Sequence, residues 1–253
     1  MLRSVKDLRG YTVRATDGDI GETHEFYFDD LGWAIRYLVV DTGSWLSGRR
    51  VLLSTVSLGQ PKWEKRIFPV LLTKEQVEHS PDIATDKPVS RQMEEELFSY
   101  YGWSPYWWGR DMPAASVGAL AVAQMIAGTE EEKSGTERGE ADPHLRSTRE
   151  VMGYHIQARD GEVGHVEDFI ADDETWIICY MVVDTQKWLS GRKVLVAPAW
   201  AEKVSWADRK VHLDLSRETI RNSPEFDPSL PVNREYEVRL YDYYGRPKYW
   251  ERL

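Results

Sequence analysis

Short apolar stretches separated by polar turns run along the first half of the chain. The sequence Asp17-Gly18 lies between two such stretches and is typical of a β-hairpin turn. Residues 33–41 are the most apolar and the richest in β-branched residues, which predicts a central strand. Five strands are predicted in all: residues 10–15, 20–28, 33–41, 50–54 and a last strand that ends near residue 72.

Two helices are predicted after these strands. Thr73 is a good N-cap residue, and Ser80-Pro81 stops the short helix that it begins. The second helix covers residues 90–101 and is ended by Gly102, the residue type that most often closes a helix. The first half of the chain is therefore a small, mainly β domain with helices at its end.

The same pattern occurs again 143 residues later. Leu2-Arg3-Ser4 recurs as Leu145-Arg146-Ser147, and the offset holds without a gap as far as Trp107 and Trp250, with about 40% of the positions identical. A repeat of about 105 residues is too long for a solenoid and has the size of an independent domain. We predict two domains, residues 1–108 and 144–253, joined by residues 109–143.

The predicted linker is first rich in alanine and then highly charged. Residues 112–128 carry no charge, but this stretch of about 17 residues is shorter than the roughly 20 that span a bilayer, and it contains Pro, Ser and Gln. We therefore predict no membrane insertion. Residues 128–142 are almost all charged residues, Gly, Ser or Thr, which predicts a flexible, solvated connection.

Composition narrows the classes of partner and compartment. The formal net charge is −10, and an acidic surface repels the phosphates of nucleic acids, so direct nucleic-acid binding is unlikely. Cys179 is the only cysteine, so no intrachain disulfide can form. Its counterpart in the first repeat is Arg36, which argues against duplicated thiol chemistry. The first residues have no apolar core of signal-peptide length, and we expect a cytoplasmic protein.

A pair of adjacent aspartates follows the second predicted strand of each repeat. Asp29-Asp30 and Asp172-Asp173 could form a metal or acid–base site. Adjacent side chains on a strand point to opposite faces, so these carboxylates converge poorly, and a solvated turn is the favoured interpretation.

The sequence contains no recognisable catalytic or metal-binding motif. None of the six histidines has a histidine at the mirrored position of the other repeat, and no Cys/His cluster or serine-nucleophile motif occurs. A site that was duplicated with the domain should appear twice. We therefore predict a protein that is not an enzyme and has no metal or cofactor.

The most literal repetition is the loop sequence Trp-Leu-Ser-Gly-Arg, at residues 45–49 and 188–192. Its arginine either pairs with the aspartate that precedes the loop, Asp41 or Asp184, or binds an anion. The chain also has 11 tryptophans, which either pack within the chain or anchor a partner. The candidate interaction surface is Trp45, Leu46, Arg49, Trp107, Trp108, Trp188, Leu189, Arg192 and Trp250.

The order of turn glycines and apolar strands resembles that of a known family. The pattern Gly-Tyr-x-Val…Asp-Gly-x-Ile-Gly at residues 10–21, the acidic pair Asp29-Asp30, and Tyr-Leu-Val-Val-Asp-Thr…Gly-Arg-x-Val-Leu-Leu at residues 37–53 are similar to the PRC-barrel family. The second repeat matches at residues 153–164, 172–173 and 180–196. The resemblance implies a mainly β fold of two tandem, small, closed PRC-type β-barrels, each followed by short helices. It also implies docking on other macromolecules, without catalysis.

Members of that family include the cytoplasmic domain of the photosynthetic reaction-centre H subunit and the C-terminal domain of a ribosome-maturation factor. The membrane helix of the first and the preceding domain of the second have no counterpart here, so neither role is carried over. We expect an interaction or scaffold protein with a protein partner or with self-association. The alternatives are a barrel that binds a small ligand or anion, and an H-subunit-like assembly role in photosynthetic electron transfer.

Overall fold

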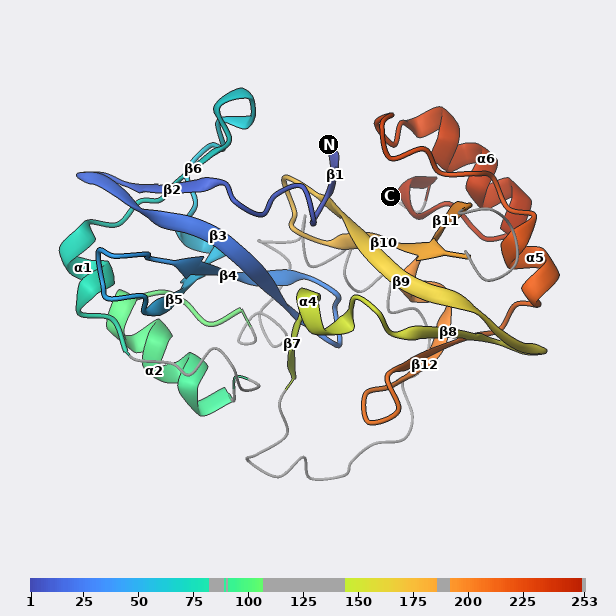
Figure 1. Ribbon diagram of the computed structural model, residues 1–253, viewed down its shortest axis with the longest axis horizontal. Helices are drawn as coiled ribbons and strands as arrows, with labels where there is room; N and C mark the ends of the chain where they lie inside the picture. Colours follow the sequence, from blue (N-terminus) through green and yellow to red (C-terminus); the bar gives the residue numbers. More distant parts are fainter. Residues whose placement is uncertain (82–88, 90, 107–143, 186–191, 252–253) are drawn as a thin grey trace. The chain divides into compact units, whose positions relative to one another are not determined.

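The computed structural model describes residues 1–81, 89, 91–106, 144–185 and 192–251. Within these residues the protein is mainly β, with two sheets and several short helices (Figure 1). The segment 109–143, for which we predicted a linker, lies outside the described residues. No helix in the described part of the chain is long and apolar enough to cross a membrane.

Each sheet contains the strands that the apolar pattern predicts. The strands of the first sheet are β2 (Thr12–Ala15), β3 (Gly18–Asp29), β4 (Ile35–Asp41), β5 (Arg50–Ser54) and β6 (Ile67–Pro69). Those of the second are β8 (His155–Ala158), β9 (Gly161–Asp172), β10 (Ile178–Asp184), β11 (Lys193–Val196), β12 (Ala201–Ser205) and β13 (Lys210–Leu213).

The first sheet has the order β5-β4-β3-β2-β6, and the second the order β11-β10-β9-β8-β13-β12. Neighbouring strands are antiparallel, except that β2 pairs with β6 and β8 with β13 in parallel. As predicted, the most apolar strand, β4, is flanked on both sides, by β3 and β5.

Both sheets are open in their hydrogen-bonding order, so closed barrels are not confirmed. In the first sheet β5 and β6 are the two edges, and in the second β11 and β12 are. After β5 and β11 the chain turns into the short 3₁₀ helices η1 (Thr55–Ser57) and η4 (Pro198–Trp200). Because a 3₁₀ turn directs its backbone groups along the chain, it interrupts the strand ladder at this position.

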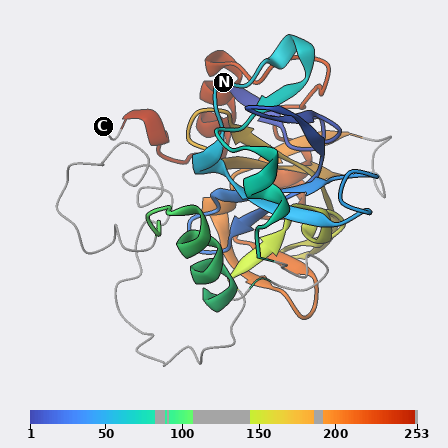
Figure 2. The same cartoon turned by 90° about the vertical axis from the view of Figure 1, so that its left-hand side faces the viewer.

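The helices begin and end where the capping residues predict. Thr73 forms a reciprocal capping box with Gln76 at the start of α1 (Lys74–Glu78). Asn233 caps α6 (Arg234–Tyr244), which Gly245 ends in a left-handed conformation. The remaining helices are α2 (Arg91–Tyr101), α4 (Thr148–Val151), α5 (Arg217–Arg221), η2 (Trp63–Lys65) and η5 (Tyr249–Glu251). In Figure 2, α1 and α2 lie in front of the strands of the first sheet.

A glycine on the long second strand of each repeat allows a close backbone approach. A Cβ atom on Gly21 would lie 2.1 Å from the carbonyl oxygen of Asp41, and one on Gly164 would lie 2.1 Å from that of Asp184. Both glycines also have positive φ, 149° and 157°. Only glycine fits this position, because any side chain would collide with backbone.

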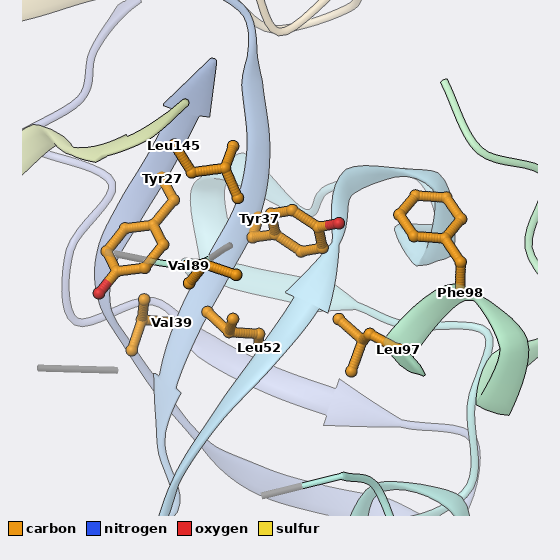
Figure 3. Packing of buried hydrophobic residues seen from close by; sticks show 8 residues of the cluster. All are labelled: Tyr27, Tyr37, Val39, Leu52, Val89, Leu97, Phe98 and Leu145. Carbon is orange, nitrogen blue, oxygen red and sulfur yellow. The ribbon is translucent and has the colours of Figure 1, made fainter. Parts of the chain in front are cut away.

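The core of the first sheet is closed by residues from three regions of the chain. Leu97 and Phe98 of α2 pack on the buried side chains of β3, β4 and β5 (Figure 3). Leu145, from the start of the second repeat, is only 2% exposed and belongs to the same cluster. The cluster is formed by Tyr27, Tyr37, Val39, Leu52, Val89, Leu97, Phe98 and Leu145.

The two compact units of the structure do not coincide with the two sequence repeats. Met1–Lys6 belong with the residues from Thr148 onward, which form the second-repeat unit. Residues 144–147 belong with the residues from Asp7 onward, which form the first-repeat unit. Each repeat therefore contributes its first residues to the unit of the other repeat. The chain passes between the units at Lys6–Asp7 and at Ser147–Thr148.

Candidate interaction sites

In each repeat the long strand, β3 or β9, has part of one edge that its own repeat leaves unpaired. A short segment from the other repeat pairs with this part. β2 is four residues long and pairs only with the first part of β3, which is twelve residues long. Beyond β2, the last part of β3 pairs with β7 (Leu145–Ser147), and in the second-repeat unit β9 pairs with β1 (Leu2–Ser4). An unpaired strand edge exposes backbone N–H and C=O groups that readily pair with another strand. We call Tyr27–Asp29 of β3 and Ile170–Asp172 of β9 the receiving edges.

Two side-chain contacts hold β7 on the receiving edge of the first-repeat unit. The Ser147 hydroxyl donates a short hydrogen bond to the carboxylate of Glu25, which is 6% exposed. The guanidinium of Arg146 pairs with Asp30, with both Nε and Nη2 at 3.2 Å from Oδ2. Together with the burial of Leu145, these contacts fix the strand in register.

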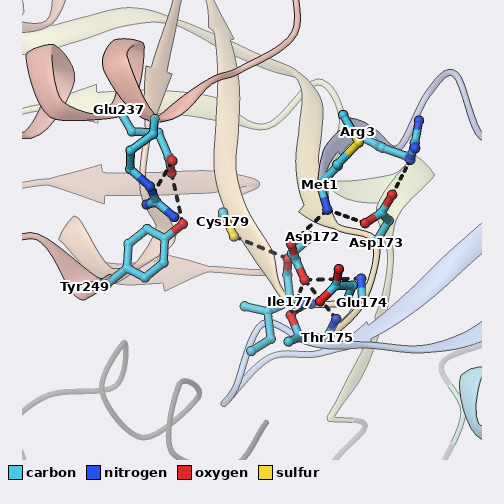
Figure 4. Close-up of polar contacts among 11 residues, drawn as sticks. Met1, Arg3, Asp172, Asp173, Glu174, Thr175, Ile177, Cys179, Glu237 and Tyr249 are labelled. Carbon is cyan, nitrogen blue, oxygen red and sulfur yellow. Dashed lines mark hydrogen bonds and ion pairs between the residues drawn. The ribbon is translucent and has the colours of Figure 1, made fainter. Parts of the chain in front are cut away.

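The same two contacts hold β1 on the receiving edge of the second-repeat unit. Ser4 Oγ donates to Asp168 Oδ2 at 2.5 Å. Arg3 Nε lies 2.5 Å from Asp173 Oδ2 (Figure 4). The backbone nitrogen of Lys6 also donates to the carboxylate of Asp168, at 3.0 Å. At both receiving edges the tripeptide Leu-Arg-Ser is therefore bound by the backbone of the edge and by two neighbouring carboxylates, one for its serine and one for its arginine.

The two aspartates at the end of β3, and the two at the end of β9, have different roles. Asp29 accepts hydrogen bonds from the Gly32 backbone and from Arg36, and Asp172 accepts three from Glu174 and Thr175. Burial alone would raise the pKa of Asp172, but the hydrogen bonds from Thr175 hold it below its ordinary value. The first aspartate of each pair thus shapes the turn, and the second binds the incoming arginine. Among the described residues, no group of His, Cys, Asp or Glu could hold a metal ion.

The arginine of the first Trp-Leu-Ser-Gly-Arg loop binds backbone carbonyls beyond the loop. Arg49 donates from Nη1 to the Glu78 carbonyl at 2.8 Å and from Nη2 to the Ser80 carbonyl at 2.5 Å. Arg192 makes the equivalent bond to the Ser223 carbonyl at 2.6 Å. These bonds join Arg49 and Arg192 to the end of the short helix that follows each sheet, so both arginines act within the chain.

Of the predicted surface tryptophans, Trp45 and Trp250 lie in the described residues, and each is in contact with a cationic side chain. Trp45 is half-buried, with the ammonium of Lys74 at 4.6 Å from its ring centre, and Leu46 is half-buried as well. Trp250 packs on Tyr241 at 5.1 Å between ring centres and carries the guanidinium of Arg234 at 4.1 Å. The other predicted anchors, Trp107, Trp108, Trp188 and Leu189, lie outside the described residues.

The aromatic residues around the C-terminal helices pack within their own units. In the first-repeat unit, Trp103 stacks on Tyr101 at 4.3 Å between ring centres. In the second-repeat unit that position after the helix is Arg246, and Trp200 from η4 packs on Tyr244 at 4.8 Å instead. The two repeats thus cover the same tyrosine with a tryptophan from different parts of the chain.

A buried glutamate on the last helix is a duplicated feature that motif searching missed. In the second-repeat unit, Glu237 is 3% exposed and accepts hydrogen bonds from the hydroxyls of Tyr180 at 2.7 Å and Tyr249 at 2.9 Å. Arg234 Nη1 lies 3.0 Å from its other oxygen. Burial raises the pKa of Tyr180 and of Tyr249, which keeps both hydroxyls protonated as donors.

The first-repeat unit contains the same cluster with a histidine beside the glutamate instead of an arginine. Glu94 is fully buried and accepts from the hydroxyls of Tyr37 at 2.9 Å and Tyr106 at 3.0 Å. His144 Nε2 lies 2.5 Å from its second oxygen. In each unit the cluster joins the C-terminal helix, a strand and the segment after the helix, so it fastens α2 or α6 to its sheet.

The sequence did carry a signal for this cluster. All three residue pairs, Tyr37/Tyr180, Glu94/Glu237 and Tyr106/Tyr249, are identical at the repeat offset. However, Glu94 begins a run of three glutamates, and glutamates on an amphipathic helix are ordinarily solvent-exposed.

Cys179 lies on β10 of the second-repeat unit and is half-buried as a residue (Figure 4). Its Sγ donates to the Ile177 carbonyl at 3.6 Å. Burial of the thiol raises its pKa to about 12, so it stays protonated at neutral pH.

Two comparisons with known proteins identified no relative of this chain. A scan against protein-family models found no match, and a search of curated proteins found no significant match.

Proposed function

We propose that this protein is a non-enzymatic docking protein whose two units are PRC-type barrels that bind other proteins in the cytoplasm. One observation carries the proposal: each unit already binds a short extended segment from a distant part of the chain along a strand edge. Addition of a strand to an exposed edge is a common mode of peptide recognition, in which backbone pairing supplies affinity and side-chain pockets supply specificity.

The chemistry of the described loops favours protein docking over anion binding. The terminal nitrogens of Arg49 donate to the backbone carbonyls of Glu78, Ser80 and Pro81, so they are engaged in fixing the loop. Trp45 and Leu46, on the same loop, keep part of their apolar surface accessible. Partly exposed tryptophans on well-fixed loops are typical of interface anchors. We therefore assign partner binding to Trp45 and Leu46 and, because the loop sequence is repeated, also to Trp188 and Leu189.

The test is affinity capture from the native host with the full chain as bait. The variant replaces both loop tryptophans, Trp45→Ala with Trp188→Ala, and the matched control is Val56→Ala. Val56 is 59% exposed, and the second repeat has an exposed alanine, Ala199, at the same position, so this change is tolerated by the fold. A protein retained by the wild type and the control but lost by the double variant supports the proposal.

Two results would contradict it. Equal capture by all three baits would remove the loops from the interface. A chain that enriches no protein, but whose melting temperature rises with a small anion or cofactor, would favour the ligand-binding alternative, because a ligand that binds only the folded state stabilises it by mass action.

A further inference from the structure

Both receiving edges bind a segment of the same sequence through the same kinds of side-chain contact. Arg3 meets Asp173 in one unit and Arg146 meets Asp30 in the other, and both edges bind the same tripeptide, Leu-Arg-Ser. Each segment leaves its own repeat to reach the edge of the other repeat. A strand from another molecule would make the same contacts at the same edge.

We propose that the receiving edge of the second-repeat unit also binds residues 1–6 of a second copy of this chain, so that two chains can exchange these strands reciprocally. This inference deepens the proposed docking function by naming one partner. The occupant follows from the contacts themselves, because the edge is matched to Leu2-Arg3-Ser4, a segment that every copy carries.

Connectivity decides which strand normally fills the edge. Residues 1–6 are joined directly to Asp7, so the chain's own strand competes at an effective concentration on the order of millimolar. A second copy at micromolar concentration loses this competition. The wild type should therefore be monomeric when dilute, and exchange becomes visible when the chain's own strand is made a poor fit.

The Arg3–Asp173 ion pair offers a way to weaken the binding of the chain's own strand to its receiving edge. Both side chains are largely buried, with exposed fractions of 25% and 8%, so placing like charges there is strongly unfavourable. An Arg3→Asp chain carries a strand that its own edge rejects. An Asp173→Arg chain carries an edge that rejects its own strand. When the two chains are mixed, they are complementary: the acidic strand of the first variant meets the basic edge of the second. The unchanged Arg3 of the second variant meets the unchanged Asp173 of the first.

The experiment measures mass by size-exclusion chromatography with light scattering on each variant alone, on the equimolar mixture, and on the double variant Arg3→Asp/Asp173→Arg. We expect monomers for each variant alone and for the double variant, whose ion pair is restored within one chain. The mixture should give a species of twice the monomer mass. If a single variant does not fold, the two chains are refolded separately and together.

Recovery of a soluble dimer only in the joint refolding supports exchange. A mixture that stays monomeric, or that fails to refold while the double variant folds as a monomer, overturns the inference. Either result leaves the host-capture test of the docking function unaffected, since that test uses the wild-type receiving edges and changes only the tryptophan loops.

Discussion

Replacing Tyr180 by phenylalanine should destabilise the second-repeat unit through the buried Glu237. The change removes one hydroxyl and leaves the ring, which is fully buried, in place. Glu237 then loses the shorter of its two tyrosine hydrogen bonds, 2.7 Å against 2.9 Å for Tyr249. No solvent can replace the lost donor at a carboxylate that is 3% exposed.

The size of the effect follows from the charge of the acceptor. A hydrogen bond to a charged group contributes about 1.5–3 kcal/mol, so we expect Tyr180→Phe to lower the free energy of unfolding by about 2 kcal/mol. Tyr249→Phe, at a more accessible hydroxyl, should cost about 1 kcal/mol. Tyr243→Phe is the matched control, because Tyr243 is 40% exposed and donates only to the Thr219 carbonyl. This control should change stability by less than about 0.5 kcal/mol.

The assay is urea unfolding followed by circular dichroism and tryptophan fluorescence. A further variant, Tyr180→Phe with Glu237→Leu, removes both partners, and its cost should be less than the sum of the two single changes. If Tyr180→Phe lies within about 0.5 kcal/mol of the wild type, the cluster does not fasten the helix as we argue. Additive costs in the double variant would refute the coupling between the two groups.

Two other predictions concern the close backbone contact at Gly21 and the half-buried Tyr101. Gly21→Ala places a Cβ 2.1 Å from the Asp41 carbonyl oxygen, at a φ of 149°. It should lower the free energy of unfolding by about 2–4 kcal/mol, measured as a lower midpoint of urea unfolding. Unchanged stability would show that β3 can shift away from β4. Burial raises the pKa of Tyr101 to about 12, so an unfolded chain releases this proton near pH 10 while the folded chain retains it. Its contribution to stability is complete below pH 10 and is lost as the pH rises to about 12, so Tyr101→Phe should flatten the fall in melting temperature over that interval.

The regular elements were predictable because their signals are local. The apolar run of residues 33–41 identified β4 as a central strand, and the capping residues Thr73 and Asn233 marked the starts of α1 and α6. A hydroxyl or amide side chain caps a helix from three residues away, so the sequence window contains the whole interaction.

The strands β1 and β7 were missed because nothing local forms them. Three residues are too few to show the period-2 alternation of a strand. The partner of Leu2 is Asp172 and that of Leu145 is Asp29, each on the other repeat. The only signal was that the similarity between the repeats begins at Leu2, before the first strand that the pattern predicts.

The pairing of β1 and β7 with strands of the opposite repeat also explains why the role of the aspartate pairs was not predicted. Within one repeat, Asp30 follows a strand at a turn, and nothing in that repeat shows which cation it binds. In the structure its partner is Arg146 of the other repeat, and Asp173 is paired in the same way with Arg3. The sequence predicted a solvated turn. In the structure the first aspartate of each pair binds the turn, and the second binds an arginine of the other repeat.

These cross-repeat pairs impose a constraint that neither repeat could satisfy alone. Asp30 and Arg3 belong to the same repeat but bind different partners, so a change at either position must be matched in the opposite repeat. The group beside the buried glutamate differs between the units, since it is Arg234 in one and His144 in the other, although the repeat counterpart of Arg234 is also an arginine, Arg91. The arginine and the aspartate of the cross-repeat pairs are identical in the two repeats, whereas the carboxylate that binds the serine is Glu25 in one repeat and Asp168 in the other. The contacts that join the two repeats are therefore kept in their charge, and not always in the residue that supplies it. The sequence repeat and the compact unit therefore differ, because each unit contains residues from both repeats.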